Sequence, residues 1–369
     1  MKRVAMNMIF HHPSQLVAEG RSGSSVRPRM MAQAFHELGY EVMEVVGSAA
    51  ARRRAMARIR SRLASGHAAD FAYSESHTLP MPLTEPHHLP TRPFLDYRFF
   101  TDLSRQGVPV GLFYRDAHWR FPELTPGYPR AKRTIVNAFH QFELKQLRHT
   151  IDHLFLPLTQ MLAVLPGTWD PSRVSSLPPG LVPRERKTSR PPDGVFRLLY
   201  VGGVTPPLYD LTPLFDAARA AKHLKVTISC RQEEWTRQED HYDVPSNVKV
   251  VHASGQDLDP LYENADAVAI LWRPHEYLSL TLPVKLFEAM AYGLPIITTS
   301  GTETASFVKL EEVGWVVESS EDVSRLTQRL IQNREVLVDA YRKVERTRER
   351  HTWQARAEQV ASTLKAVHE

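Results

Sequence analysis

The sequence predicts an α/β protein made of two domains, each built around a parallel sheet. The chain has 369 residues, which is enough for about two domains. Short apolar runs alternate with segments of helical periodicity in both halves, and this alternation is typical of parallel sheets with crossover helices. A stretch rich in proline and arginine, residues 178–192, separates the two series and is expected to be a linker. The predicted domains are therefore residues 1–185 and 192–350, followed by a C-terminal helix within 351–369.

The first half begins with a strand, a loop, a helix and a second strand. Residues 4–10 form a short apolar run, and a loop rich in glycine and serine follows it. Pro28 suits a first helical turn, and apolar residues recur at helical spacing from Met31 to Leu38. A second strand is expected at 40–46. Further strands are predicted at 71–73, 108–114 and 153–156, helices at 95–103 and 131–148, and a loop lying over the ligand cleft at 78–93.

The second half restarts the same alternation. Gly202 and Gly203 end the strand at 196–201, and Arg231 follows the next strand. Strands are predicted at 196–201, 225–230, 248–251, 267–271 and 295–299, and helices at 211–221, 258–264, 284–292, 322–350 and 353–368. Ligand sites in such folds lie at the carboxyl ends of the strands, so the residues that follow the strands are the first candidates for function.

Composition excludes several classes of protein. Hydrophobic residues make up 42% of the chain, and a single cysteine rules out an internal disulfide framework or a Cys-based zinc cluster. The 17 histidines show no ligand spacing, so no metal site is expected. No apolar run approaches the roughly 20 residues of a membrane-spanning helix, and the N-terminus does not have a signal-peptide core. We expect a cytoplasmic protein.

Charge is unevenly distributed between the halves. Residues 1–190 contain 26 Lys and Arg against 15 Asp and Glu, whereas the remainder is acidic. An arginine-rich amphipathic segment at 51–63 contributes Arg52, Arg53, Arg54 and Arg58. These arginines suit peripheral contact with an anionic membrane, and equally a solvated surface helix. Nucleic acid is a poorer candidate, because no aromatic residues interleave with the arginines and no nucleic-acid-binding motif appears.

The segment 283–297 carries the clearest motif. Pro283 favours a helix start, Gly293 a helix end, and Pro295 the entry to a strand. Lys285 and Glu288 are three residues apart and share one helix face. A cation beside a helix N-terminus suits a diphosphate, and a carboxylate one turn deeper can accept hydrogen bonds from two ribose hydroxyls. A solvent-exposed ion pair is the alternative interpretation of the same spacing.

This segment resembles the nucleotide-binding motif of GT-B glycosyltransferases, especially family 4 and its relatives in glycosyltransferases group 1. The positions that match are Pro283, Lys285, Glu288, Ala291, Gly293 and Pro295. The resemblance implies two Rossmann-like domains facing across a cleft, with the C-terminal helix packing back on the N-terminal domain. It also places Arg231, Gly202 and Gly203 near the donor nucleotide. Family 4 enzymes commonly carry a second glutamate eight positions before the ribose-binding one, where this chain has Leu280.

Two groups in the N-terminal domain are further candidates. The backbone of Gly23 and Ser24, at a predicted helix N-terminus, is suited to the donor phosphates, although an ordinary flexible turn explains the same residues. Asp116 and His118 follow a predicted strand, where the resemblance implies contact with the acceptor or with the reacting groups. Asp116 is the candidate base if the reaction inverts configuration, and a structural Asp–Arg pair is the alternative.

The resemblance implies transfer of a sugar from a nucleoside diphosphate donor, such as a UDP-sugar, to a saccharide, glycolipid or protein-glycan acceptor. It further implies a retaining, metal-independent reaction that needs no cofactor. Two other functions remain open on the sequence: a nucleotide-sugar epimerase of the same fold, and a non-catalytic transferase-like accessory or binding subunit.

Overall fold

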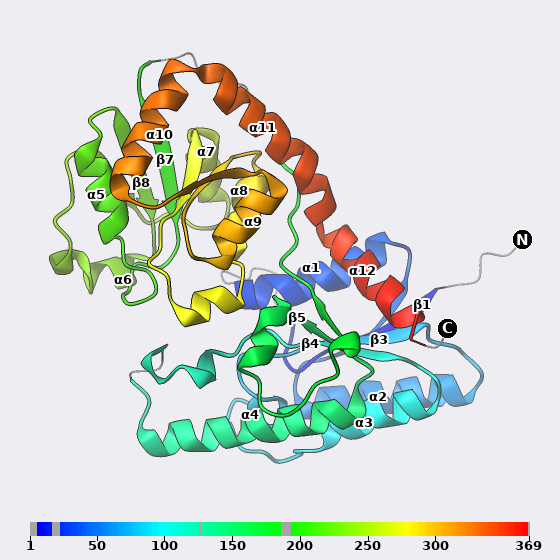
Figure 1. Ribbon diagram of the computed structural model, residues 1–369. Helices are drawn as coiled ribbons and strands as arrows, with labels where there is room; N and C mark the ends of the chain where they lie inside the picture. Colours follow the sequence, from blue (N-terminus) through cyan, green and yellow to red (C-terminus); the bar gives the residue numbers. More distant parts are fainter. Residues whose placement is uncertain (1–5, 17–22, 125–126, 186–192, 368–369) are drawn as a thin grey trace, which may run out of the picture. The chain divides into compact units, whose positions relative to one another are not determined.

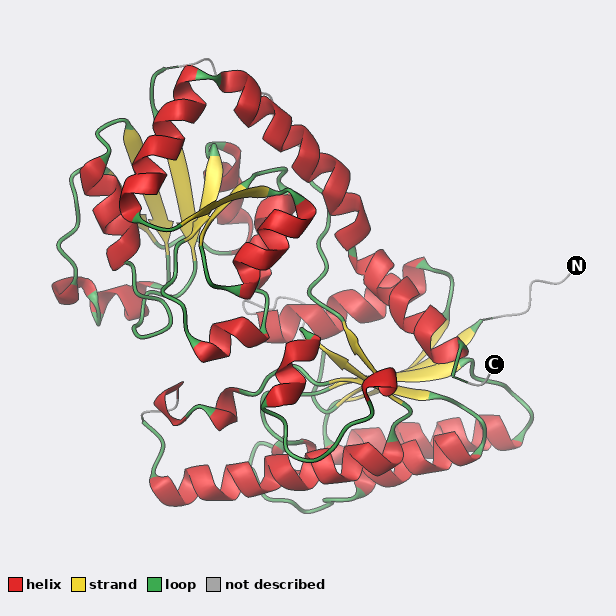
Figure 2. Cartoon of the chain, viewed as in Figure 1, coloured by secondary structure: helices red, strands yellow, loops and turns green. Residues whose placement is uncertain are grey.

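The computed structural model describes residues 6–16, 23–124, 127–185 and 193–367 (Figure 1). The chain divides into two units. The first unit comprises Met1–Gly180 together with Trp353–Glu369, and the second comprises Leu181–Thr352. The chain passes from the first unit to the second between residues 180 and 181, and it returns to the first unit between 352 and 353. The sequence predicts these boundaries at 185–192 and at 350/351. Each unit consists of a parallel sheet with helices on its faces (Figure 2).

The first unit contains a six-stranded parallel sheet in the order β2-β1-β3-β4-β5-β6. Its strands are β1 (Asn7–His12), β2 (Glu41–Val46), β3 (Phe71–Glu75), β4 (Val110–Phe113), β5 (His153–Leu156) and β6 (Val174–Ser176). Its helices are α1 (Gly23–Glu37), α2 (Ala49–Ala64), α3 (Leu95–Arg105), α4 (Arg130–Thr150) and α12 (Trp353–Lys365). Helices α2, α3 and α4 run along one face of the sheet, and α1 and α12 along the other (Figure 1).

The second unit contains another six-stranded parallel sheet, in the order β12-β11-β10-β7-β8-β9. Its strands are β7 (Phe196–Val201), β8 (Leu224–Ser229), β9 (Val248–Val251), β10 (Ala267–Ile270), β11 (Ile296–Thr299) and β12 (Gly314–Val317). Its helices are α5 (Thr212–Ala220), α6 (Gln232–Thr236), α7 (Asp259–Glu263), α8 (Val284–Ala291), α9 (Glu303–Glu311), α10 (Ser320–Gln332) and α11 (Arg334–Arg348).

Strand order locates a topological switch point in each unit. The chain reverses its direction of travel across the first sheet between β1 and β3, and across the second between β7 and β10. At such a switch point the loops leaving the two neighbouring strands diverge, and ligands of open α/β sheets bind beyond the carboxyl ends of the strands there. Ligand-binding residues are therefore expected after β1, β3 and β4 in the first unit, and after β7, β8 and β10 in the second.

Helix α12 is part of the core of the first unit. Trp353, Ala357, Val360 and Leu364 recur at helical spacing, and all are buried. They join a cluster with Phe35, Phe71 and other residues of α1 and the sheet. A Cβ atom at Gly111 of β4 would lie 2.8 Å from Leu364 Cδ2, so a larger residue there would force the Leu364 side chain to move. The last helix of the chain thus completes the fold of the unit in which the chain begins.

The structure corrects some of the predicted elements and refines others. The single helix expected at 322–350 is two helices, because Asn333 has non-helical backbone angles of φ −123° and ψ 83°. The segment 78–93 is a loop, as predicted, except for a short 3-10 helix at Met81–Leu83. Met81 and Leu83 are buried, and the Met81 amide donates to Glu143 Oε1 at 2.9 Å. Strands β6 and β12 were not predicted, because they have three and four residues and are only partly buried.

Arg52 corrects one part of the predicted membrane surface. Its side chain is 2% exposed, and it forms two hydrogen bonds to Asp96, at 2.8 and 2.9 Å. Its Nη1 also donates to the carbonyl oxygens of Pro13 and Gly47. Arg52 therefore cannot contact a membrane, because its donors are used inside the unit. Arg53, Arg54 and Arg58 are exposed, while Ala55, Met56 and Ile59 bury the apolar face of α2 against the unit itself.

Among the described residues, no helix combines the length and apolar character required to span a bilayer.

Candidate functional site

Lys285 and Glu288 lie on the first turns of α8, the helix that follows β10. Pro283 precedes the helix with extended backbone angles, and the chain turns into β11 after Gly293, which has a φ of +68°. Because α8 connects parallel neighbours β10 and β11, it runs back across the sheet and its N-terminus lies at the carboxyl edge. The motif residues therefore lie at the edge where α/β sheets bind ligands.

The Glu288 carboxylate is held by two neighbours. Lys285 Nζ lies 2.6 Å from Glu288 Oε2, and the hydroxyl of Tyr262 donates to the same oxygen at 3.0 Å. The side chains of Lys285 and Glu288 are 30% and 35% exposed, so both remain accessible. Tyr262 is buried and stacks on Tyr292 with ring centroids 4.4 Å apart. Burial and the nearby Glu288 raise the pKa of Tyr262 well above its usual value, so its hydroxyl remains a proton donor.

The tyrosine partner of Glu288 was missed in the sequence. Tyr262 lies on α7, 26 residues before Glu288, and only the packing of α7 beside α8 brings them together. A tyrosine inside a short helical segment gives no signal of this contact. The structure thus adds an orienting hydroxyl to a pair that the i, i+3 spacing had predicted.

Gly202 and Gly203 follow β7, as predicted, in a loop fixed by side chains. Glu234 Oε1 accepts from the Val204 amide at 2.9 Å and from Thr205 Oγ1 at 2.8 Å. A Cβ atom at Gly203 would lie 2.7 Å from Cδ2 of Tyr209. Packing by itself therefore explains glycine at position 203, and the predicted contact with the donor stays a prediction.

Arg231 directly precedes α6 and is exposed. It follows β8, whose register pairs Ser229 with Val201 of β7, and Gly202 N donates to the Ser229 carbonyl at 3.1 Å. Arg231 and the Gly202–Gly203 loop therefore leave adjacent strands at the same edge of the sheet. This placement is compatible with the predicted phosphate contact.

Leu280 is 4% exposed and belongs to the core of the second unit. The position where family 4 enzymes commonly present a second carboxylate to the donor sugar therefore carries a buried apolar side chain here. A donor sugar would have to be recognised by other residues.

Asp116 and His118 lie in the loop after β4 and contact each other. The His118 amide donates to Asp116 Oδ1 at 2.8 Å, and His118 Nδ1 lies 3.3 Å from Asp116 Oδ2. The two side chains are 25% and 24% exposed, so they can be reached from solvent. Asp116 therefore closes a turn with His118, a contact that differs from the Asp–Arg pair considered in the sequence, and its catalytic role stays a prediction.

Two charged residues near this loop were not identified from the sequence. Glu75 ends β3 and is fully buried, and Arg27 of α1 donates to its Oε1 at 3.1 Å. A charged residue closing an otherwise apolar strand was the available signal for Glu75. Arg27 gave none, because its neighbours in the sequence form an ordinary polar helix start.

The predicted phosphate loop is only partly described. Residues 17–22, which precede Gly23, lie outside the described residues, and α1 begins at Gly23. The side chain of Ser24 is also outside the described part, so its proposed contact remains a prediction.

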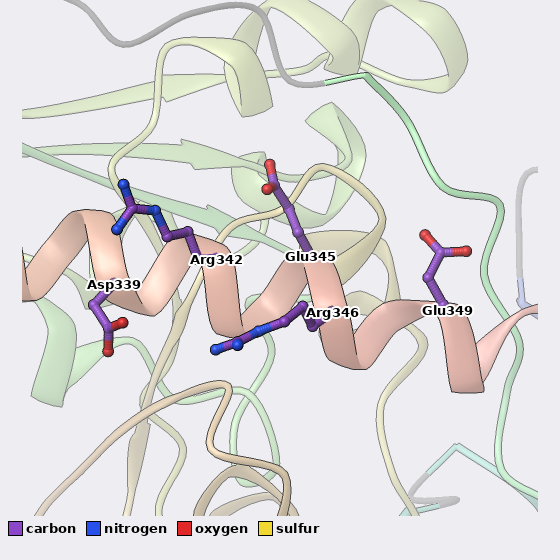
Figure 3. Close-up of a pocket in the computed structure, with 5 residues that line it drawn as sticks. All are labelled: Asp339, Arg342, Glu345, Arg346 and Glu349. Carbon is purple, nitrogen blue, oxygen red and sulfur yellow. The ribbon is translucent and has the colours of Figure 1, made fainter.

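No metal cluster marks the candidate residues in the part of the chain that the structure describes. Within the described ranges, no group of three or more His, Cys, Asp or Glu side chains gathers in a way that could hold a metal ion. An open surface hollow of about 570 Å³ lies along α11 (Figure 3), lined by Asp339, Arg342, Glu345, Arg346 and Glu349. Four of these side chains come from α11, and Glu349 directly follows it. None is a candidate residue, so we assign the hollow no ligand.

Comparison with solved structures defines the class of fold. The structure matches HepE from Anabaena in complex with UDP and glucose with a TM-score of 0.61 and 14% identity, covering 98% of this chain and 100% of that one. It matches sucrose-phosphate synthase from Thermosynechococcus elongatus with a TM-score of 0.58 and 13% identity, covering 98% and 99%. WaaG, a glycosyltransferase involved in lipopolysaccharide biosynthesis, matches with a TM-score of 0.54 and 14% identity, covering 96% and 99%. The predicted GT-B fold with two α/β domains is confirmed.

The family comparison agrees with the motif. Residues 195–333 match the family Glycosyl transferases group 1, and this range contains Gly202, Arg231, Lys285 and Glu288. Residues 195–333 thus resemble group 1 glycosyltransferases, as the motif at 283–297 predicts. No curated protein matches the sequence.

Proposed function

We propose that the protein transfers a sugar from a nucleoside diphosphate donor, such as a UDP-sugar, to a saccharide, glycolipid or protein-glycan acceptor. The observation that carries this proposal is the contact set of Glu288 with Lys285 and Tyr262 at the N-terminus of α8, inside the range that matches group 1. HepE, which shares the fold, is described in complex with UDP and glucose. The first unit, with Asp116 and His118 after β4, receives the acceptor.

The donor is bound by groups of matched chemistry. The Glu288 carboxylate accepts hydrogen bonds from two ribose hydroxyls, and Tyr262 holds it in position. Lys285 and the N–H groups at the N-terminus of α8 balance the negative charge of the diphosphate. The Gly202–Gly203 loop after β7 and Arg231 after β8 also contact the diphosphate.

The transfer breaks the bond between the anomeric carbon and the diphosphate oxygen, and the electron pair leaves with the nucleoside diphosphate. An acceptor hydroxyl oxygen forms the new bond to the same carbon. Its proton passes to the departing phosphate in the retaining reaction that we favour, and Asp116 would take it in an inverting one. The placed cations and helix N-terminus stabilise the leaving group, so the proposed step is metal-independent.

A thermal-unfolding panel of UDP-, GDP-, ADP- and dTDP-linked sugars tests the donor. The correct donor at 100 times its Kd should stabilise the fold by about 2.7 kcal/mol. Adding an acceptor should then release the nucleoside diphosphate. Interconversion of the nucleotide-sugar without any acceptor would instead identify an epimerase, and the absence of binding by every donor would favour the accessory role.

Peripheral contact with an anionic membrane is proposed for Arg53, Arg54 and Arg58 alone. Because Ala55, Met56 and Ile59 are buried in the unit, no apolar face of α2 is left to insert, and the contact is electrostatic. Each exposed arginine near an anionic surface contributes about 1 kcal/mol, so replacing all three with glutamate should abolish sedimentation with acidic vesicles. A matched control replaces Arg329, Arg342 and Arg346, which are exposed in the second unit. Equal loss in both variants would show a net-charge effect and contradict a site on α2.

A further inference from the structure

Three buried ionisable side chains, His12, Arg27 and Glu75, meet the partly buried Arg115 at the carboxyl edge of the first sheet, and we call these four residues the Arg115 cluster. His12 ends β1, Glu75 ends β3, and Arg115 follows β4 by two residues. These three strands are neighbours, so their ends lie together beside the switch point between β1 and β3. His12 and Arg27 are each 5% exposed, and Glu75 is not exposed at all.

Part of the cluster is well bonded. Arg27 Nε donates to Glu75 Oε1 at 3.1 Å, and its Nη1 donates to the Pro178 carbonyl at 3.2 Å. The Arg27 guanidinium also lies 3.6 Å from the centre of the Phe113 ring. The hydroxyl of Tyr73 donates to the same Glu75 oxygen at 2.9 Å. These contacts fix Arg27 and Glu75 in place and occupy one carboxylate oxygen.

Each of the four residues also carries at least one polar atom that is buried and has no hydrogen-bond partner: His12 Nε2, Arg27 Nη2, Glu75 Oε2, and Nε and Nη2 of Arg115. Buried polar atoms without partners are few in native proteins, because each loses its hydration without replacement. Their concentration in one place indicates that the protein keeps them for a ligand.

The free atoms are of two kinds. Arg115 and Arg27 offer N–H donors in the planar arrangement that matches a carboxylate or phosphate. Glu75 Oε2 offers an acceptor, and His12 offers a second one when its Nδ1–H donates to the Ser14 carbonyl oxygen 2.9 Å away. Burial lowers the pKa of His12 to about 3, with Ser14 opposing and Arg115 adding to the effect, so His12 is neutral at physiological pH.

The charges of the cluster also favour an anion. Two guanidiniums face one fully buried carboxylate, and the neighbouring His12 and His77 are neutral because burial lowers the pKa of His77 to about 4 as well. Burial lowers the pKa of Arg115, Glu75 raises it, and Arg27 lowers it. Arg115 therefore lies close enough to Glu75 and Arg27 to interact with both charges. The neighbouring Asp116 carries a negative charge that opposes an anion, but its side chain is about a quarter exposed, so water screens this charge more than that of the buried Glu75.

We propose that the Arg115 cluster binds the oxyanion of a hydroxylated ligand, and that the acceptor of this enzyme is therefore an acidic sugar whose carboxylate or phosphate pairs with Arg115 and Arg27. Glu75 and His12 accept hydrogen bonds from its hydroxyls. The identification of this ligand as the acceptor rests on the proposed transfer function, whereas binding of the oxyanion does not.

The test measures thermal unfolding and calorimetric binding of the full chain with glucuronate, glucose 6-phosphate, inorganic phosphate and neutral glucose at equal ionic strength. We expect glucuronate or glucose 6-phosphate to raise the Tm above the value reached with glucose, and the better of the two identifies the carboxylate or the phosphate. Arg115→Gln should weaken that binding by at least about tenfold, since hydrogen bonds to charged groups are lost. Arg115→Lys keeps the positive charge but loses the planar pair of N–H donors, so its affinity should lie between those of the parent protein and Arg115→Gln.

Arg60→Gln is the matched control, because Arg60 pairs with Asp102 on the exposed side of the same unit. It should bind the acidic sugar like the parent protein. Equal shifts with glucuronate, glucose 6-phosphate and glucose, or no shift with any of them, would overturn the proposal. Binding that survives in Arg115→Gln but is lost in Lys285→Ala would place the anion at the donor site and overturn it as well.

Titration with UDP separates this proposal from the donor assignment. Arg115→Gln should bind UDP normally if the two sites are independent. An unchanged Tm without ligand shows that the unit carrying the substitution is folded. Loss of acidic-sugar binding with UDP binding retained supports the Arg115 cluster. Failure of UDP, GDP, ADP and dTDP alike to bind the parent protein would contradict the donor proposal and leave the oxyanion result standing.

Discussion

Replacing Arg52 with methionine is expected to lower the free energy of unfolding by about 3–5 kcal/mol, because it leaves the Asp96 carboxylate buried without its main partner. Asp96 is 3% exposed and receives two hydrogen bonds from Arg52. The carbonyl oxygens of Pro13 and Gly47 also lose a donor. Urea unfolding at pH 7 measures the change, and Arg53→Met is the matched control. Arg53 is exposed on the same helix, so its replacement should cost less than about 0.5 kcal/mol.

The cost of Arg52→Met should depend on pH in a defined direction. Burial raises the pKa of Asp96, but Arg52 and His11 lower it by more than burial raises it. The pKa of Asp96 therefore lies well below its usual value. A depressed pKa gives stability that is present above the unfolded value of about 3.9 and is lost as pH falls. Without Arg52, burial would dominate and Asp96 would take up a proton. The difference between variant and parent should therefore shrink between pH 7 and pH 4, and a constant difference would contradict this account.

The double variant Arg52→Met/Asp96→Leu tests whether the unpaired Asp96 charge causes the loss of stability. It removes both charges, so it should be more stable than Arg52→Met alone, although the Pro13 and Gly47 carbonyls stay unpaired. His11 is kept neutral by burial, which lowers its pKa, and its Nε2 lies 3.0 Å from Asp96. Its contact with Ser74 at 2.7 Å should hold the ring in place in both variants.

Replacing Glu288 with alanine is expected to weaken nucleotide binding on the order of 100-fold or more. Two hydrogen bonds from ribose hydroxyls to a carboxylate contribute roughly 1.5–3 kcal/mol each, and alanine removes both. Fold stability should change little, because the Glu288 side chain is 35% exposed and its ion pair with Lys285 is partly screened. Calorimetry with the nucleoside diphosphate that binds the parent protein measures the affinity.

Tyr262→Phe provides the matched variant for the Glu288 site. It removes the hydroxyl that donates to Glu288 Oε2 but keeps the ring that stacks on Tyr292. We expect a loss of about tenfold, smaller than that of Glu288→Ala, because the carboxylate remains but is less well oriented. Unchanged affinity in Glu288→Ala would show that the ribose is bound elsewhere and would remove the observation on which the proposed function rests.

The sequence by itself determined the two α/β domains and the pair at the start of α8. Hydrophobic periodicity reports burial along one element, and the spacing of Lys285 and Glu288 fixes their common face whatever surrounds the helix. The strands around β1, β7 and β10 were predicted for the same reason, since strands buried on both faces are continuous apolar runs. The short, partly buried strands β6 and β12 lack this signal.

Only the tertiary structure decided which residues meet across the chain. Arg52 was grouped with Arg53 and Arg54 on an arginine-rich helix, but its partner Asp96 lies 44 residues further on and draws its side chain inward. Tyr262 reaches Glu288, and the Arg115 cluster gathers residues from three strand ends and a helix. Local sequence reports which face a residue occupies, whereas the pairing of charges and hydroxyls depends on contacts between distant segments. Such contacts are set by strand order and helix packing, and these leave no local pattern.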